Sequence, residues 1–580
     1  MENIYRNVYS GEVDITYVGK EVRVAGWINS IRKLGGLTFV TLRDETGIVQ
    51  IITEDADMFK GITRESTVTI TGTVKLRTED MINPNMKTGK IEILASSVEV
   101  LGECASILPF EINRSREEAS EETRLKYRYL DLRNPKVHDN MVFRFKVIDY
   151  IRSLMKSMNF TEISTPIITT SSPEGARDFI IPSRKYKGKF YALPQAPQIY
   201  KQLLMVSGFN KYFQIAPCFR DEDPRADRAP GEFYQLDFEM SFVTEEDVYK
   251  VGEKIFYDVF SNFTDKYVSP APFRRIPYSE AMLKYGSDKP DLRNPLIISE
   301  LTNIFKNTTF TPFIGSTVRG IKVSNIEKSN SWYKKMEEYA KEIGMSGLAY
   351  LKVTEENTLK GSLDKYLTDE ERNELFTSLE LKINDTLFIV SDKKKCEKYA
   401  GLLRTKLGEE LDLIDKDRYE FCIVNDFPFY EWNEEDNKWD FGHNPFSMPQ
   451  GGLDALNNKP IESILAYQYD FVCNGCEMAS GAVRNHSIEI MKKAFLLAGY
   501  DEEVVKTKFK SLYTAFQYGA PPHAGMAPGI DRIIMLLTGE ENLREVQIFP
   551  PNVSGQDLLM GGPTEVTETQ LRETHLKIRD

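Results

Sequence analysis

The sequence predicts a multidomain α+β protein that begins with a small five-stranded β-barrel. The chain has 580 residues. That is too many for one hydrophobic core, and a typical domain size of about 150 residues suggests roughly four domains. Five short β-type runs lie between residues 20 and 101, whereas apolar residues at helical spacing begin after residue 135. The composition, with 41% hydrophobic and 28% charged residues, is that of an ordinary globular protein.

Cysteine usage and charge limit the class of protein. The six cysteines are scattered without the spacing of a disulfide framework, which favours a reducing compartment. The first residues lack the apolar core of a signal peptide, and no run approaches the roughly 20 apolar residues of a membrane span. We therefore expect a cytoplasmic protein without membrane contact. The net charge of −13 argues against indiscriminate nucleic-acid binding, so any RNA contact must come from local patches and stacking.

The amino-terminal runs are typical of a small OB-type barrel, whose open face commonly receives single-stranded nucleic acid. They are Glu21–Ile28, Leu37–Arg43, Ile48–Thr53, Thr67–Val74 and Ile91–Val100, with glycines and polar turns between them. The segment from Arg32 to Phe39 would place two cations and an aromatic ring on that face. A solvated turn beside a core phenylalanine explains the same residues.

The rest of the chain changes character several times. Residues 106–135 are charged and helix-prone, as in a hinge, and an apolar helix from Val142 to Met158 precedes a short strand, Phe160–Pro166. A buried core helix is one interpretation of that pattern. Residues 295–415 contain a lysine-rich helix and a strand, and they predict an α+β domain inserted into another. The predicted domains are 1–105, 106–135, 136–294, 295–415, 416–555 and a C-terminal extension, 556–580.

Two separated segments carry arginines suited to bind phosphates. The first is Phe219–Arg228, which runs on to Asp237, and the second is Gly525–Arg532. The sequence contains neither a P-loop nor a Rossmann glycine fingerprint, so a nucleotide here must be held by arginines and aromatic stacking. Arginine-rich loops are more often surface salt-bridge networks, and the string from Phe219 to Asp237 is what favours the nucleotide interpretation.

These two segments resemble motifs 2 and 3 of class II aminoacyl-tRNA synthetases, and the residues between them resemble the bacterial-type aspartyl-tRNA synthetases of class IIb. The resemblance implies an anticodon-binding OB-fold at 1–105 and a catalytic domain, 136–294 and 416–555, built on an antiparallel six- to seven-stranded sheet. It also implies the bacterial-type insertion at 295–415 and a homodimer formed through the helix and strand after residue 136. Three positions depart from the family pattern, namely Ala196, Gly231 and Asn444.

The resemblance further implies an aspartate-tRNA ligase. Such an enzyme joins L-aspartate and Mg-ATP to give aspartyl-adenylate and transfers the aspartyl group to the 3′ end of tRNA(Asp). The sequence leaves open whether tRNA(Asn) is also charged. Both reactants of the first step are anionic, so the site must supply positive charge and geometry rather than a base. Arg220 can bridge the α-phosphate and the carboxylate, because its planar fork serves two acceptors.

The family motifs assign roles to individual positions. Arg220, Arg532 and Glu477 would be catalytic, and the ATP-binding residues would be Arg220, Glu222, Arg228, Phe233, His443, Glu477, Gly529 and Arg532. Aspartate would be bound by Glu174, Gln198, Lys201, Arg220, Asp237, His443 and Arg484, with Arg484 and Lys201 as fixed cations for its side chain. Arg32, Phe39, Gln50 and Glu92 would contact the tRNA anticodon.

Metal ligands follow from the same comparison. Asp470 and Glu477 would hold Mg²⁺, which favours carboxylates together with phosphate oxygens. Two edge-strand acids facing solvent would have the same spacing. Cys473 and Cys476 form a CxxC motif, but no second pair at finger spacing accompanies it, so zinc or redox chemistry is not favoured.

Two other kinds of protein fit the sequence less well. An amide-forming ligase that has lost tRNA would lack the barrel at residues 20–101. A catalytically inactive RNA-binding regulator would have lost Arg220, Glu477 or Arg532, and all three are present.

Overall fold

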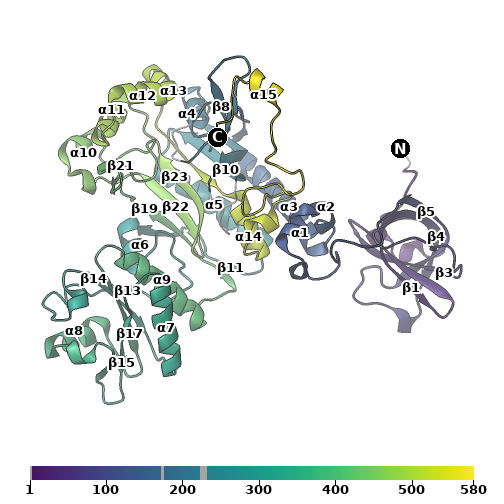
Figure 1. Cartoon of the computed structure of the whole chain (residues 1–580), viewed down its shortest axis with the longest axis horizontal. Helices are drawn as coiled ribbons and strands as arrows, with labels where there is room; N and C mark the ends of the chain where they lie inside the picture. Colours follow the sequence, from purple (N-terminus) through teal and green to yellow (C-terminus); the bar gives the residue numbers. More distant parts are fainter. Residues whose placement is uncertain (1–2, 172–175, 223–230, 580) are drawn as a thin grey trace. The chain divides into compact units, whose positions relative to one another are not determined.

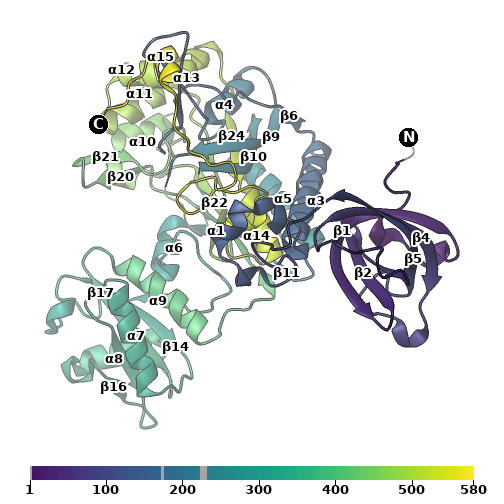
Figure 2. The same ribbon diagram turned by 45° about the vertical axis from the view of Figure 1, so that its right-hand side comes forward.

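The computed structural model describes residues 3–171, 176–222 and 231–579. The chain divides into two compact units, Met1–Arg114 and Ser115–Asp580, each with its own core (Figures 1 and 2). In the described residues, no helix is long and apolar enough to cross a membrane.

The first unit is a closed five-stranded barrel with the strand order β1-β2-β3-β5-β4. The five predicted runs are its strands, which are β1 (Glu21–Leu34), β2 (Leu37–Asp44), β3 (Gly47–Thr53), β4 (Thr67–Leu76) and β5 (Ile91–Gly102). Strand β1 extends past its predicted end because Gly35 and Gly36, both at positive φ, make a tight turn that keeps it paired with β2. Alternate residues such as Val22, Val24, Val40 and Leu42 fill the barrel, so the residues between them face outward.

The second unit is built on an eight-stranded sheet, β12-β19-β22-β23-β24-β10-β9-β6. Its strands are β6 (Thr161–Glu162), β9 (Lys211–Arg220), β10 (Gly231–Ser241), β12 (Arg274–Pro277), β19 (Phe421–Asn425), β22 (Gln468–Cys473), β23 (Cys476–Val483) and β24 (His523–Pro528). The six central strands are antiparallel, whereas β6 and β12 pair in parallel at the two edges. The prediction of six or seven strands was therefore wrong. The strand predicted at Phe160–Pro166 is the two-residue β6 at one edge, whereas no sequence pattern predicted β12 at the other edge.

One face of this sheet is covered by helices α3 (Pro135–Ser157), α5 (Glu245–Phe263) and α14 (Ile530–Thr538). Side chains such as Ile151, Phe256 and Ile533 pack there against Phe238 and Phe471 of the sheet. The predicted apolar helix is the middle and end of α3. Asn134 caps its first turn, and Pro135 at the first helical position needs no hydrogen-bond donor there. Because this face is filled, the opposite face remains for a site.

The inserted domain has its own five-stranded sheet, β13-β14-β17-β15-β16. Its strands are β13 (Ile298–Glu300), β14 (Thr317–Val323), β15 (Ala349–Val353), β16 (Leu359–Gly361) and β17 (Thr386–Asp392), and its helices are α7 (Asn330–Glu342), α8 (Asp369–Leu379) and α9 (Cys396–Glu410). Two hydrophobic clusters form on this sheet. Arg404 of α9 donates hydrogen bonds to the carbonyl oxygens of Leu296, Asp291 and Asn294 at 2.6 to 3.0 Å, which ties the domain to the segment that enters it.

The remaining elements surround the main sheet. They are α1 (Glu121–Lys126), α2 (Arg128–Asp131), β7 (Ile180–Pro182), β8 (Phe190–Ala192), α4 (Gln198–Val206), β11 (Tyr267–Val268), α6 (Tyr278–Tyr285), β18 (Arg418–Tyr419), β20 (Tyr430–Asn433), β21 (Lys438–Phe441), α10 (Gly452–Asn458), α11 (Ile488–Leu497), α12 (Glu502–Lys508), α13 (Lys510–Ala515) and α15 (Glu568–Glu573). Arg124 of α1 forms an ion pair with Glu545, so α1 is fixed to the segment after α14.

Candidate active site

Strand β10 organises the site. Leu236, Phe238 and Met240 point into the hydrophobic core, so by alternation Phe233, Gln235, Asp237 and Glu239 line the other face of the sheet. Two residues along a strand advance by roughly 6.5 Å, which spreads these four side chains over about 20 Å. One strand therefore contributes an aromatic ring, an amide and two acids to a single surface.

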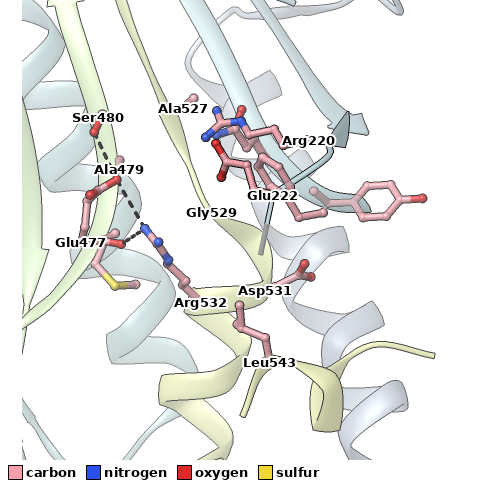
Figure 3. Close-up of a pocket in the computed structure, with 14 residues that line it drawn as sticks. Arg220, Glu222, Glu477, Ala479, Ser480, Ala527, Gly529, Asp531, Arg532 and Leu543 are labelled. Carbon is pink, nitrogen blue, oxygen red and sulfur yellow. Dashed lines mark hydrogen bonds and ion pairs between the residues drawn. The ribbon is translucent and has the colours of Figure 1, made fainter. Parts of the chain in front are cut away.

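A pocket lies over the first half of this surface (Figure 3). Arg220 and Glu222 come from the end of β9, Phe233 and Gln235 from β10, Glu477 and Ser480 from β23, and Gly529 and Arg532 from the start of α14. The Arg220 guanidinium lies 5.0 Å from the centroid of the Phe233 ring. Arg532 Nη1 donates to the carbonyl oxygen of Glu477 at 2.7 Å and lies 3.4 Å from its Oε1.

These contacts determine what the pocket can bind. Two guanidinium groups, from segments about 300 residues apart in the sequence, enter one cavity beside an aromatic face. The Nε atom of Arg220 is buried and has no hydrogen-bond partner in the part of the chain that the structure describes. A buried donor of this kind is costly unless a ligand satisfies it. The pocket therefore suits an anionic ligand with a planar ring.

A pair of acids borders the pocket. Ser480 Oγ donates to Asp470 Oδ1 at 2.6 Å and to Glu477 Oε1 at 3.2 Å, and Lys289 Nζ lies 3.2 Å from Glu477 Oε2. Asp470 is only 7% exposed on a central strand, so the alternative of two solvent-facing edge-strand acids is wrong. Burial, followed by repulsion from Glu477, raises the pKa of Asp470 to about 8.

A charged cluster is buried further along β10. Lys201 Nζ of α4 contacts Asp237 Oδ1 at 2.7 Å and Glu239 Oε2 at 3.3 Å. Arg484, which directly follows β23, donates from Nε to Glu239 Oε1 at 2.9 Å and from Nη2 to Glu239 Oε2 at 3.3 Å. All four side chains are at most 4% exposed. The charges of the two cations are balanced by those of two acids, Asp237 and Glu239. The sequence had predicted Asp237 as the acid partner of the cations.

Glu239 is the residue of this cluster that sequence reasoning did not select. Its position two residues after Asp237 on a strand was the available signal, since such residues share a face. Lys289, Ser480 and Gln235 were also not selected. Only Gln235 had a comparable signal, because it continues the same alternation. Lys289 comes from the segment that leads into the inserted domain, and no sequence pattern links it to Glu477.

The other predicted site residues are more scattered. The amide of Gln198 donates to Gln202 Oε1 at 3.0 Å, and Gln202 contacts His523 Nε2 at 3.0 Å, so Gln198 belongs to a buried polar network. His443 lies outside the pocket lining, with its ring 4.7 Å from that of Phe427. Loss of hydration next to the surrounding protein atoms lowers the pKa of the His443 ring. Glu174 and Arg228 lie outside the described residues.

Gly231, the departure from the motif 2 pattern, is the first residue of β10. Its φ of +78° lies in the left-handed region, which glycine tolerates better than other residues. The extra residue is therefore accommodated at the start of the strand, and the register of Phe233 with Cys218 on β9 is regular.

Comparison with known proteins decides the family. The family described as tRNA synthetases class II (D, K and N) matches residues 120–553, which include every element of the pocket. The chain belongs to this family. Residues 22–101 match a second family, the OB-fold nucleic acid binding domain.

Individual relatives agree with this family. The protein is 53% identical over 591 residues to a Rickettsia akari (strain Hartford) protein named "Aspartate--tRNA(Asp/Asn) ligase", with 99% of this chain and 98% of the relative covered. It is 51% identical to a protein of the same name from Rickettsia prowazekii (strain Madrid E), with 99% and 97% covered.

Two solved structures share the fold. One is asparaginyl-tRNA synthetase from Pyrococcus horikoshii complexed with asparaginyl-adenylate, with a TM-score of 0.58, 20% identity and 94% and 98% of the two chains covered. The other is a putative aspartyl-tRNA synthetase from Leishmania major Friedlin, with a TM-score of 0.59, 20% identity and 94% of each chain covered. These structures support the fold, and the family match over residues 120–553 makes the chain a class II tRNA synthetase, which is a ligase.

The barrel of this synthetase groups several predicted residues on its outer surface. Phe39 pairs with Arg32 across β1 and β2, and Gln50 lies on β3 diagonally opposite Phe39. Phe39 is half-buried and outside the barrel core, so it is not the core phenylalanine of the alternative interpretation. Gln50 Nε2 donates to Glu92 Oε2 at 2.9 Å. Next to them, the buried Nη2 of Arg77 has no hydrogen-bond partner among the described residues, a signal that the sequence did not reveal.

The CxxC motif has a simple structural explanation. Cys473 and Cys476 are opposite each other at the end of the β22–β23 hairpin, and Asn474 and Gly475 between them have φ values of 52° and 81°. These are the angles of the two-residue turn that matches the twist of paired strands. Within the described residues, no three His, Cys, Asp or Glu side chains gather as they would around a metal ion.

Proposed function

We propose that the chain is an aspartate-tRNA ligase. It joins L-aspartate to ATP to form aspartyl-adenylate and pyrophosphate, and then transfers the aspartyl group to the 3′ end of tRNA. The buried cluster of Lys201, Asp237, Glu239 and Arg484, placed on the same strand as the pocket, is the observation that carries the choice of amino acid. The names of the Rickettsia relatives support the same choice.

In the first step, the α-carboxylate of aspartate attacks the α-phosphorus of ATP, and the bond to the β-phosphate oxygen breaks. Arg220 contacts both the carboxylate and the α-phosphate, so its charge holds two anions at reaction distance. Phe233 stacks on the adenine, with Glu222 at its edge. Arg532 stands across the pocket, where Glu477 orients its guanidinium to stack on the other face of the adenine.

The side chain of aspartate is bound by Arg484 and Lys201. Each cation is held by buried acids, and each still has N–H groups to donate. Asp237 and Glu239 fix their directions, and Glu174, Gln198 and His443 stay predictions as contacts of the amino acid. A site of this kind selects a carboxylate over an amide, because an amide nitrogen would face donors without an acceptor.

The acid pair fits a magnesium ion. Asp470 and Glu477 share one hydroxyl, and burial and mutual repulsion raise the pKa of Asp470. A divalent cation would relieve both effects. Asp470 and Glu477 would hold it, and the bound ion would neutralise charge on the phosphates. Ser480 keeps the two carboxylates directed at one point.

The substrate RNA is read at the barrel. Arg32, Phe39, Gln50 and Glu92 form the anticodon-binding surface, with Phe39 stacking on a base. Because the relatives carry the name Asp/Asn, we propose that both tRNA(Asp) and tRNA(Asn) are charged. We further propose a cytoplasmic homodimer whose interface includes the exposed side of α3, where Phe145 is 67% exposed.

An exchange assay with labelled pyrophosphate tests which amino acid the enzyme activates. Exchange of label into ATP is expected with aspartate and not with asparagine, and an enzyme that shows exchange with asparagine alone would contradict the proposal. Aminoacylation of purified tRNA(Asp) and tRNA(Asn) side by side then tests the RNA. Charging of tRNA(Asp) alone would show that the barrel discriminates between them.

A further inference from the structure

A basic hairpin stands out from this acidic chain. Strands β7 and β8 pair antiparallel, and their connecting turn carries Arg184, Lys185, Lys187 and Lys189, all exposed, within six residues. Tyr186 is 56% exposed at the tip, and Phe190 is 43% exposed beside it. Four cations with interleaved aromatic rings are unexpected in a chain with a net charge of −13. We call residues 183–190 the basic turn.

The side chains of the three lysines form no ion pair within the part of the chain that the structure describes, whereas Arg184 contacts Glu573. Lys189 Nζ lies 5.8 Å from the centroid of the Tyr186 ring. A solvated loop gains nothing from collecting like charges, because they repel one another. A polyanionic partner would explain the collection.

The base of the hairpin is joined to the pocket by hydrogen bonds. Leu193 N donates to Phe179 O at 2.9 Å, and Phe219 N donates to Pro194 O at 2.9 Å. Arg177 Nε donates to Asp221 O at 2.9 Å, directly after Arg220. Each strand of the hairpin has only three residues, so the basic turn lies roughly 15 Å from this junction. The turn is therefore close to the pocket in which the reaction takes place.

The C-terminal extension supports the hairpin. Helix α15 lies beside β7 and the basic turn, and Arg184 Nε contacts Glu573 Oε2 at 3.2 Å. Ile181 of β7 and Leu571 and Leu576 of the extension line a shared apolar depression. Helix α15 is itself fixed at its start by the reciprocal hydrogen bonds of Thr567 and Gln570. The extension thus gives a two-stranded ribbon, which is marginally stable alone, a second packing surface.

We propose that the basic turn binds the single-stranded 3′ end of tRNA on its way into the pocket, and that α15 holds the turn in position. This inference rests on the proposed function, because the terminal adenosine must reach the adenylate for the second step. Lysine ammonium groups contact backbone phosphates, and Tyr186 offers a stacking surface for a base. Such contacts ignore sequence, as they must if more than one tRNA is a substrate.

The size of the effect follows from counterion release. On a single strand, affinity varies with salt to a power of about −0.7 per neutralised phosphate. Three lysines therefore contribute an exponent of about −2. This exponent corresponds to an affinity for the RNA that is roughly 50-fold higher at 0.15 M salt than at 1 M salt. The first step of the reaction involves no tRNA and should not change.

The test is the triple variant Lys185→Ala/Lys187→Ala/Lys189→Ala of the full-length enzyme. We expect its KM for tRNA in aminoacylation to rise roughly 10- to 50-fold and to depend less steeply on salt. Aspartate-dependent pyrophosphate exchange should stay within about twofold of wild type. The matched control removes three exposed lysines of α7, Lys334, Lys335 and Lys341, and should change neither quantity.

Each outcome bears on one proposal. If wild type shows no aspartate-dependent exchange, the proposed function fails. If wild type exchanges and the triple variant has an unchanged tRNA KM, or one no different from that of the α7 control, the basic turn does not bind tRNA. The variant Leu571→Ser should raise the tRNA KM by a smaller factor with exchange unchanged, and a wild-type KM would overturn the supporting role of α15.

Discussion

Replacing Arg484 separates a substrate-binding role from a structural one. Glu239 is fully buried and receives two hydrogen bonds from Arg484 at 2.9 and 3.3 Å. Among the described residues, Arg484→Leu therefore leaves that carboxylate with Lys201, at 3.3 Å, as its remaining cation. Breaking a buried ion pair from one side costs about 3–5 kcal/mol of stability. Two charged hydrogen bonds to the substrate, worth about 1.5–3 kcal/mol each, add a loss of roughly 150- to 25,000-fold in kcat/KM for aspartate.

The double variant Arg484→Leu/Glu239→Gln distinguishes the two effects. It removes the unpaired carboxylate, so its thermal midpoint should recover toward wild type, whereas aspartate-dependent pyrophosphate exchange should stay as low as in Arg484→Leu. Both quantities can be measured on the same preparations. If exchange returned to within tenfold of wild type, Arg484 would act only by neutralising Glu239, and the side-chain pocket would be misplaced.

Three further predictions concern the pocket and its surroundings. Arg220→Ala should lower pyrophosphate exchange by roughly 100- to 1,000-fold with an unchanged thermal midpoint, as expected for one preorganised donor, and a tenfold loss or less would argue against its bridging role. Lys289→Met removes the cation 3.2 Å from Glu477 Oε2, so Mg²⁺ should raise the thermal midpoint more in the variant than in wild type, and an equal rise would show that Lys289 does not balance the acid pair. Burial lowers the pKa of His523, so the unfolded chain binds more protons below about pH 6.5. The stability that its neutral ring provides is therefore present above that pH and lost as the pH falls. The thermal midpoint of wild type relative to His523→Gln should accordingly be higher at pH 7.5 than at pH 5.5, and a constant difference would contradict this.

The barrel illustrates what sequence patterns can determine. Five β-type runs bounded by glycines and polar turns predicted all five strands, and each strand has one face in the barrel core and one in solvent. Only the ends of the strands differ from the predicted ends. The difference is largest in β1, whose extension depends on the turn at Gly35 and Gly36. The edge strands of the main sheet are shorter. Strand β6 has two residues of the longer strand predicted at Phe160–Pro166, and β12, with four residues, left no pattern.

The site shows the complementary limit. Motif strings located Arg220, Phe233, Glu477 and Arg532, and the structure brings these into one pocket. A sequence motif cannot identify the residue with which each charged side chain forms an ion pair. Lys289 meets Glu477 from almost 190 residues away, and that contact depends on how the inserted domain is attached to the sheet.

The charge balance of the buried cluster explains how it can select an anion without being cationic overall. Lys201 and Arg484 are offset by Asp237 and Glu239, so the four side chains together carry no net charge that would destabilise the fold. Donors nevertheless remain. Arg484 uses Nε and Nη2 on Glu239 and on the Gly525 carbonyl, and its Nη1 donates to no described residue. Lys201 spends two of its three N–H groups on acids. The two acids fix the directions of the unused N–H groups. A side-chain carboxylate would therefore be bound by these oriented donors and not by a net positive charge of the cluster.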